Sequence, residues 1–431
     1  MKDPFDRRQF LQSALGMSAF ALNACCVGSA DAAVPNPVLG QVSSSSLWLS
    51  SKGGDCRDVS TANTFLSQNG GLAGWEYAFG KIVDDYSGGV FNPYWGPLGA
   101  MVFHGGGHAA TFDNSVVILD FNDLTFKRLS DPTTSNNGAN WVSTTGLTVK
   151  TDPAFNRTYC EYGDGQPGSA HTYDTLAILP PGDGGAPCGS LIRVSSHAVH
   201  VNISGNTGWS HRFDFPSTAM RKGKWARWSV NGATRYLIPG ACSAYDSLRK
   251  RFWWMAGLSS APPMIQYLDV ATQQQLEIRY AAKAQIAPAA NPDSLTLRYE
   301  PVRDILVLTC TVSGNLVLAF LRCANPEQGW VVPHLLASIP AMAGAAHPFD
   351  FVPDADKFVL LSGADTSAVY DFAPPQDPAL PWAVIRRPVT GLLIPSAYVV
   401  GKRWSYSQAV KSFVWMAKSS SAVVAYRPVG L

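Results

Sequence analysis

The chain has 431 residues and a formal net charge of +2, with 46% hydrophobic and only 15% charged residues. This composition is too apolar for a disordered chain, too poor in charge for a coiled coil, and lacks the lysine- and arginine-rich runs that indicate a nucleic-acid partner. The 38 glycines, 30 prolines and 13 tryptophans are typical of many short strands joined by turns, so they favour an all-β architecture.

The N-terminal segment has the features of an export signal. Arg7 and Arg8 precede Phe10 and a moderately apolar stretch that ends in small residues. Paired arginines in this position resemble the twin-arginine type of signal, which is removed after export. The stretch is too short to span a membrane, so we expect no transmembrane segment. We predict a signal peptide over 1–32 and a periplasmic or secreted protein; a lipid anchor at Cys25 is the less favoured alternative.

The cysteines are scattered and give no metal-binding spacing. Two of the eight lie in the predicted signal, and no CxxC pair occurs, so a zinc ribbon is not expected. In an oxidising compartment Cys160 and Cys188 could form a local disulfide, and buried free thiols are an equal alternative.

A short segment recurs along the chain, consisting of a polar turn between two runs of β-forming residues. Its five copies lie at 151–159, 245–253, 299–306, 351–359 and 406–414. Each copy predicts a β-hairpin. A third apolar run follows in several units, and then a fourth strand with one aromatic or aliphatic residue: Phe126, Trp228, Leu276, Trp330 and Trp382.

Four antiparallel strands in about fifty residues make up one propeller blade. Further units near 86–129 and 194–228 bring the count to seven. We therefore predict an all-β, seven-bladed β-propeller of four-stranded antiparallel blades over 46–431, after a linker over 33–45. The last unit lacks a fourth strand, and an N-terminal strand at 46–50 is expected to complete it and close the ring. Two separate β-sandwiches are the alternative.

The first unit resembles a kelch blade. The segment 103–108 (Phe-His-Gly-Gly-Gly-His) places glycines after the second strand, the run 114–120 follows, and Phe126 lies in the fourth strand. This order is similar to that of the kelch/galactose-oxidase-like superfamily of β-propellers, and the similarity extends over nearly the whole mature chain. The resemblance implies a fold and says little about activity, because propellers carry many functions.

Three histidines fall in equivalent loops of consecutive predicted blades. In a four-stranded blade, the loop between the second and third strands lies on the face where substrates usually meet the central channel. His108, His171 and His211 occupy such loops, and glycines precede all three. Tyr173 and Arg212 lie within two residues of these histidines. We predict that the five residues are catalytic.

Other residues are expected at the mouth of the central channel on this face, or just below it. Those predicted to bind substrate are Trp141, Trp209, His347 and Arg403. His104 alternates with an apolar residue on a strand and is expected to support His108 from below. Ordinary strand packing of Tyr173 and an ion pair between Arg212 and Asp214 are the structural alternatives for two of the catalytic candidates.

A set of His, Tyr and Arg side chains suits β-elimination in an acidic polysaccharide. Arg neutralises the uronate carboxylate and acidifies the C5 proton, which His or Tyr removes. Propeller-fold polysaccharide lyases such as the ulvan lyases use a similar set, and this chain resembles them in fold and residue types. We therefore predict an exported, monomeric polysaccharide lyase whose partner is an acidic polysaccharide or oligosaccharide.

Other functions fit the same residues. A noncatalytic glycan-binding propeller would use loop tryptophans to stack on sugar rings. A metalloenzyme would bind a metal ion through His108, His171 and His211, since three imidazoles suit zinc or copper. A glycoside hydrolase would need paired carboxylates, for which nothing in the sequence fixes a separation. No Tyr-His pair occurs, so a copper-radical oxidase is disfavoured, and we expect no cofactor apart from the possible metal ion.

Overall fold

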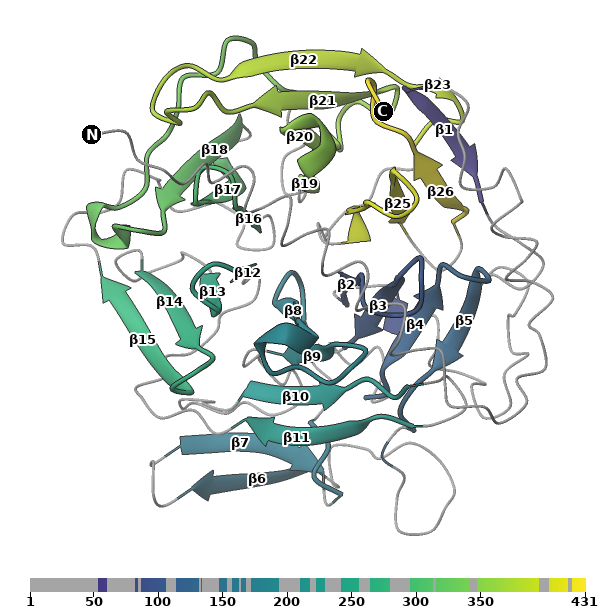
Figure 1. Ribbon diagram of the computed structural model, residues 1–431, viewed down its shortest axis with the longest axis vertical. Helices are drawn as coiled ribbons and strands as arrows, with labels where there is room; N and C mark the ends of the chain where they lie inside the picture. Colours follow the sequence, from purple (N-terminus) through teal and green to yellow (C-terminus); the bar gives the residue numbers. More distant parts are fainter. Residues whose placement is uncertain are drawn as a thin grey trace, which may run out of the picture.

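The computed structural model describes the parts of the chain that form the sheets and their shorter turns. The described residues are 53–59, 82–83, 87–105, 114–131, 133, 147–152, 157–162, 164–167, 172–193, 210–217, 222–228, 242–255, 264–279, 295–312, 315–340, 347–394, 403–417 and 421–431. Their sheets are arranged around a common centre, as in a β-propeller (Figure 1).

The first three blades each have four antiparallel strands. Blade 1 contains β2 (Gly88–Asn92), β3 (Ala100–His104), β4 (Val117–Asp120) and β5 (Thr125–Arg128). Blade 2 contains β8 (Leu176–Leu179), β9 (Ser190–Arg193), β10 (Ser210–Asp214) and β11 (Lys224–Trp228), with the 3-10 helix η2 (Pro181–Asp183) after its first strand. Blade 3 contains β12 (Cys242–Asp246), β13 (Arg251–Met255), β14 (Met264–Asp269) and β15 (Gln274–Arg279).

The remaining blades vary at their outer edges. Blade 4 contains β16 (Thr296–Glu300), β17 (Ile305–Val312) and β18 (Asn315–Arg322), followed by η4 (Pro326–Gln328) and a single bridge from Val331 to Phe320. Blade 5 contains β19 (Phe349–Val352), β20 (Lys357–Leu360), β21 (Ala368–Ala373) and β22 (Ala383–Pro388), with η5 (Pro353–Ala355) after β19. Blade 6 contains β24 (Ser405–Ser407), β25 (Ser412–Met416), β26 (Val423–Tyr426), β1 (Asp55–Asp58) and β23 (Thr390–Gly391).

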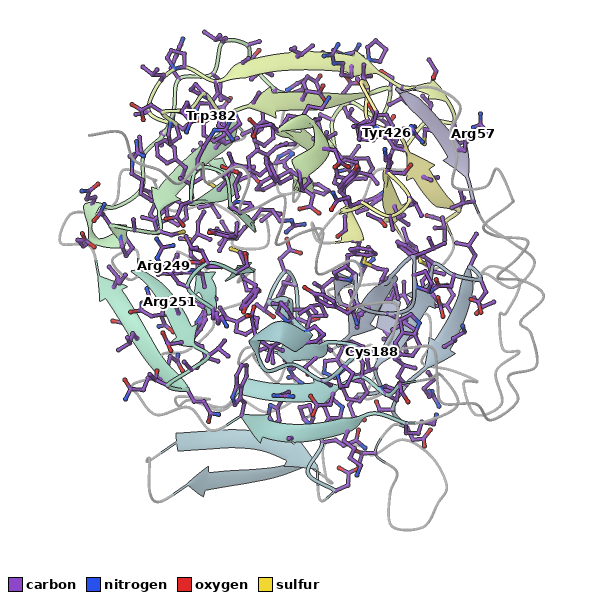
Figure 2. The ribbon with its side chains drawn as sticks, viewed as in Figure 1. Arg57, Cys188, Arg249, Arg251, Trp382 and Tyr426 are labelled. Carbon is purple, nitrogen blue, oxygen red and sulfur yellow. The ribbon has the colours of Figure 1, made fainter. Side chains whose placement is uncertain are left out.

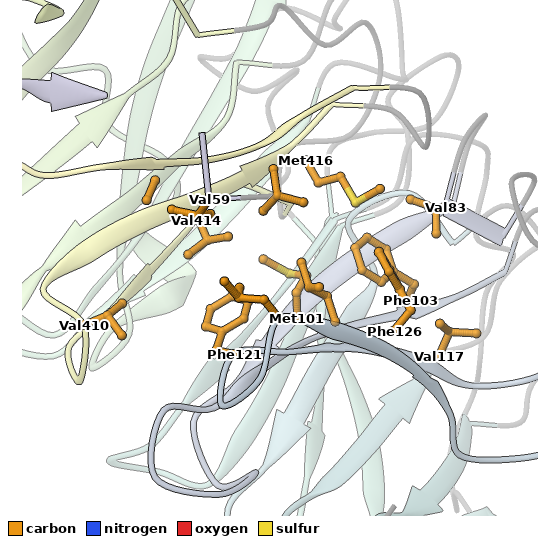
Figure 3. Close-up of a cluster of buried hydrophobic side chains, with 14 of the residues drawn as sticks. Val59, Val83, Met101, Phe103, Val117, Phe121, Phe126, Val410, Val414 and Met416 are labelled. Carbon is orange, nitrogen blue, oxygen red and sulfur yellow. The ribbon is translucent and has the colours of Figure 1, made fainter. Parts of the chain in front are cut away.

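The six blades form a closed cycle. Their innermost strands contact one another in the order β2, β8, β12, β16, β19 and β24, and β24 returns to β2. Six clusters of buried hydrophobic side chains accompany this cycle, one between each pair of neighbouring blades. Figure 3 shows the cluster between blades 6 and 1, where Val414 and Met416 lie opposite Met101 and Phe103. The hydrophobic core therefore consists of the interfaces between blades.

The predicted count of seven blades is wrong, and the described residues form six. The hairpin predicted at 151–159 exists as β6 (Leu147–Asp152) and β7 (Arg157–Tyr162), which form a two-stranded sheet of their own. In Figure 1 this hairpin lies outside β11, and it supplies no innermost strand. The described strands within the unit expected over 194–228, β10 and β11, instead form the outer part of blade 2. A local turn pattern predicts a hairpin but not its radial position, which depends on contacts distant in sequence.

The strand that pairs with β26 lies later in the chain than expected. β1 pairs antiparallel with β26 and parallel with β23. The expected strand at 46–50 lies outside the described residues.

Two further expectations concern cysteines and membrane segments. The cysteines of the described residues are buried free thiols: Cys56, Cys188, Cys242, Cys310 and Cys323. The side chain of Cys160 is not among those that the structure describes.

Among the residues the structure describes, no helix is long and apolar enough to cross a membrane.

Candidate functional site

A polar cluster lies at the edge of the interface between blades 1 and 2. His104 ends β3, Arg193 ends β9 and His211 lies near the start of β10, so all three are at the face where loops join second and third strands. We call this face the upper face. Together with Trp225 on β11, these residues form what we call the His104 cluster.

Strand alternation explains why these polar residues meet. Side chains two residues apart lie on the same face of a strand. Arg193 therefore shares the face of Leu191, and His211 that of Phe213, both of which pack in the hydrophobic cluster between blades 1 and 2. Arg193 and His211 are also directly opposite each other across β9 and β10. The polar groups thus cover the upper end of an otherwise apolar interface.

The contacts of His104 determine its protonation state. The side chain is fully buried, with Nε2 3.2 Å from Arg193 Nη1 and Nδ1 3.3 Å from the carbonyl oxygen of Ser115. A guanidinium only donates hydrogen bonds, so Nε2 accepts and Nδ1 carries the proton that is donated to Ser115. Burial, the charge of Arg193 and the nearby His211 lower the pKa of His104. The imidazole is therefore neutral.

Backbone contacts hold the start of blade 2 against blade 1. Thr172 Oγ1 donates to the carbonyl oxygen of His104 at 2.7 Å and accepts from the amide of Gly88 at 2.7 Å. A Cβ atom at Gly88 would lie 1.9 Å from the carbonyl oxygen of Tyr173. This close approach requires glycine, because any side chain would separate the two blades at the cluster.

Several predicted site residues lie outside the described residues. These are His108, His171, Trp141 and Trp209. Their predicted roles, including a metal site of three histidines, stay predictions. Of the loop histidines, His211 is described, and it is buried in the His104 cluster.

Two further catalytic candidates, Tyr173 and Arg212, lie among the described residues. Tyr173 is buried and has a left-handed backbone with φ of 39°. Arg212 lies on the opposite face of β10 from His211, and its Nε is 2.5 Å from Asp214 Oδ1. This is the ion pair considered as an alternative from the sequence, and it directs the guanidinium away from the His104 cluster.

His347 and Arg403 are buried at the starts of inner strands, and the structure does not bring them into the His104 cluster. Burial lowers the pKa of His347 to about 4. Arg403 donates to the carbonyl oxygens of Ser87, at 2.6 Å, and of Ala417, at 3.0 Å. The guanidinium thus ties blade 6 to the start of blade 1.

Arg193 and Trp225 were not predicted from the sequence. Arg193 ends the short buried strand Ser190–Arg193, and a charged residue closing a buried run is an available signal. Trp225 carries no comparable signal, because tryptophans are frequent throughout the chain.

The opposite face contains a group of acidic side chains that could suggest a metal site. Among the described residues, ligand atoms of Asp246, Asp304 and Cys323 lie within 4.8 Å of one another. Arg249, which is labelled in Figure 2, contacts both carboxylates, at 3.2 Å from Asp246 and 2.5 Å from Asp304. Burial raises the pKa of the Cys323 thiol. The guanidinium supplies the positive charge that a metal ion would bring, so this group is a structural ion pair.

Comparisons with known proteins identify no family. No family model matches the chain, and no curated protein matches it in sequence. Solved structures with similar chains include an auxiliary nutrient binding protein from Bacteroides ovatus ATCC 8483 (TM-score 0.42, 11% identity, 80% of this chain and 69% of that chain). Another is an auxiliary nutrient binding protein from Bacteroides thetaiotaomicron VPI-5482 (TM-score 0.45, 8% identity, 78% and 68%). A third is a chain of the mitotic checkpoint complex (TM-score 0.40, 11% identity, 82% and 93%).

Proposed function

We propose that this chain is an exported propeller that binds an acidic oligosaccharide at its upper face without cleaving it. The observation that carries the proposal is the buried Arg193, whose guanidinium contacts a neutral imidazole at 3.2 Å. Arginine presents five N–H donors in a planar fork that matches a carboxylate. His104 adds no charge, and the guanidinium of Arg193 is the group of the cluster whose shape and charge suit a uronate carboxylate.

Binding without cleavage is favoured by the contacts of the candidate catalytic groups. Both ring nitrogens of His104 already take part in hydrogen bonds, so this imidazole is not placed to exchange a proton with a sugar. Tyr173 is buried, and Arg212 is engaged by Asp214. β-Elimination needs an accessible base and an accessible acid, and His104, Tyr173 and Arg212 supply neither.

Export and superfamily membership belong to the same proposal. The twin-arginine-type signal over 1–32 and the linker over 33–45 support secretion to the periplasm or beyond. The strand order of blade 1, with Phe126 in its fourth strand, supports a kelch/galactose-oxidase-like propeller.

The proposal is tested by calorimetric titration with short oligogalacturonate, oligoalginate and heparin-derived oligosaccharides, each beside its carboxyl-reduced form. We expect at least one acidic oligosaccharide to bind, and the carboxyl-reduced form to bind at least about tenfold more weakly, since a tenfold change corresponds to about 1.4 kcal/mol. The ultraviolet absorbance of unsaturated uronates should stay constant. Rising absorbance would support the lyase instead, and equal binding of acidic and reduced forms would overturn the proposal.

A further inference from the structure

The outermost strand of blade 5 has an open edge. Among the described strands β22 pairs with β21 on one side only, and Figure 1 shows it at the outer rim of the ring. Val389, directly after β22, donates to the carbonyl oxygen of Ser367, directly before β21, at 2.8 Å. Hydrogen-bonded partners alternate along an antiparallel pair, so the backbone groups of Val384, Arg386 and Pro388 point away from β21.

One chain segment covers the start of this edge. Trp382, directly before β22, donates to the carbonyl oxygen of His334 at 2.8 Å and accepts from the amide of Leu336 at 3.0 Å. The segment then turns inward, because Ile339 is buried in the hydrophobic cluster between blades 4 and 5. It therefore leaves the edge near the start of β22.

β1 covers the edge beyond the other end of β22. Thr390 donates to the carbonyl oxygen of Gly54 at 3.0 Å, where β23 and β1 pair in parallel. Because the two strands are parallel, the chain N-terminal to β1 leads back along β22. Within the part of the chain that the structure describes, no hydrogen bond reaches the outward backbone groups of Val384 and Arg386. Open groups at a sheet edge attract a further strand, and proteins commonly cover such edges.

We propose that residues 48–52 form an additional strand, which pairs in parallel with β22 and completes blade 5 at its outer edge. These residues lie outside the described part of the chain, which begins at Gly53, and they directly precede it. The occupant of the open edge is thus the segment that β1 already directs toward it. The proposal concerns the rim of the ring and does not depend on what the upper face binds.

The pairing of β1 with β23 sets the register. Thr390 lies opposite Asp55 and donates to the residue before it. Continuing this register along β22 places Ser51 opposite Arg386, and the residue two positions earlier opposite Val384. In a parallel pair, each outward residue donates to the residue before its opposite and accepts from the residue after it.

This register satisfies the open backbone groups of the edge. The amides of Val384 and Arg386 donate to the carbonyl oxygens of Trp48 and Ser50. Their carbonyl oxygens accept from the amides of Ser50 and Lys52. Four hydrogen bonds therefore follow from continuing the existing register, and the strand ends where the segment over 334–336 covers the edge.

The side chains of the segment suit both faces of the edge. Leu49 shares a face with Val384, which packs against the cluster between blades 4 and 5. Trp48 lies on the other face with Ile385, whose side chain is 45% exposed and would be covered. The sequence predicts a strand at 46–50 that completes the last blade. The proposal keeps a strand in this region and assigns it to blade 5.

The test is a pair of proline substitutions in the chain from residue 33 onward, after the predicted signal. Ser50→Pro removes an amide that bonds to Val384, whereas Ser51→Pro removes one that faces solvent and is tolerated at an edge. Hydrogen exchange, read at single residues by mass spectrometry, reports on the amides of Val384 and Arg386. We expect both to exchange at least about tenfold faster in Ser50→Pro than in the parent or in Ser51→Pro.

The amides of Ile385 and Arg387 are the internal reference. They belong to the pairs directed toward β21, so they should stay protected in the parent and in every variant. A chain that lacks residues 33–52 should show the same fast exchange at the outward amides as Ser50→Pro, with this reference intact.

Two results would overturn the proposal. Fast exchange of Val384 and Arg386 in the parent would mean that nothing covers the edge. Equal protection in the parent, in Ser50→Pro and in the chain without residues 33–52 would mean that another strand covers it. If that protection increases with protein concentration, the other strand comes from a second copy of this chain.

Discussion

His347 and His104 are both fully buried, and burial lowers the pKa of each imidazole. An unfolded histidine titrates near 6.5, whereas His347 in the folded protein titrates at about 4. As the pH falls below 6.5, the unfolded chain binds a proton that the folded protein does not. The stability contributed above pH 6.5 is therefore lost progressively until the pH reaches the folded pKa of about 4.

Replacing His347 should reduce this loss. We expect His347→Gln to flatten the dependence of unfolding free energy on pH between about 6.5 and about 4, by roughly 3 kcal/mol at most. Chemical denaturation at several pH values measures the effect. His334→Gln is the control for replacing a histidine as such, because the His334 side chain is exposed. If the unfolding free energy of His347→Gln depends on pH as steeply as that of the parent, the lowered pKa of His347 is not the cause of the loss.

The sequence predicted the candidate site in part. His211 and His104 could be singled out because both lie beside loops between predicted second and third strands, with glycines close by. Arg193 could not be joined to them, since it contacts His104 from another blade, 89 positions away. Contacts between blades depend on the tertiary arrangement, which no local pattern contains.

The recurrent segment forms the hairpin between the first and second strands of blades 3 to 6. In each described copy in the ring, the turn ends in a residue with a left-handed backbone directly before the second strand: Lys250, Asp304, Asp356 and Lys411. In blade 4, Glu300 accepts hydrogen bonds from the turn amides of Val302 and Arg303. The Nη1 and Nη2 groups of Arg303 donate to Oδ1 and Oδ2 of Asp356 in blade 5, at 2.7 Å and 2.8 Å. Asp356 is itself one of the residues with a left-handed backbone. The turn thus joins neighbouring blades as well as reversing the chain.

We expect Arg303→Gln to destabilise the protein. Glu300 is fully buried and its pKa is raised by burial, so removing the nearby cation leaves a buried carboxylate without charge compensation. The expected cost is roughly 2–3 kcal/mol, below the usual range for a buried pair because Asp356 is half exposed. Thermal or chemical unfolding measures it.

Two further variants test the cause. Adding Glu300→Gln to Arg303→Gln should recover part of the lost stability, because the buried charge is removed as well. Arg322→Gln breaks the exposed pair with Asp377 and should leave the thermal midpoint nearly unchanged. If Arg303→Gln changes the thermal midpoint as little as Arg322→Gln does, the contact of Arg303 with Glu300 and Asp356 contributes nothing to stability.

Hairpins were predictable from the sequence, but their arrangement was not. The copies at 245–253, 299–306, 351–359 and 406–414 correspond to hairpins at the start of blades 3 to 6. The copy at 151–159 also forms a hairpin, but this hairpin lies outside the ring. Turn chemistry is local, whereas the number of blades is determined by how the apolar faces pack into six interfaces.

At the scale of the whole molecule, blades 5 and 6 are joined at the rim by two segments distant in sequence. The segment after blade 5 forms β23, which pairs with β1, and β1 in turn pairs with β26. Leu392 donates to the carbonyl oxygen of Cys56 at 3.1 Å, and Thr390 donates to that of Gly54 at 3.0 Å. Gly391 has φ of 87°, and a Cβ atom there would lie 2.6 Å from the Cys56 carbonyl oxygen. Only glycine allows this approach.

We therefore expect Gly391→Ala to loosen β1. The left-handed backbone alone costs about 1–2 kcal/mol for an alanine, and the contact with Cys56 adds to it. Because Cys56 is a buried free thiol, a displaced β1 exposes it, and alkylation followed by mass mapping should show about tenfold faster labelling of Cys56. Gly182→Ala is the matched control, since a Cβ atom there meets nothing within 4 Å. Labelling of Cys188 and Cys310, buried in other interfaces, should not change. Equal Cys56 labelling in Gly391→Ala and the parent would mean that the β1–β23 pairing does not hold the N-terminal strand in place.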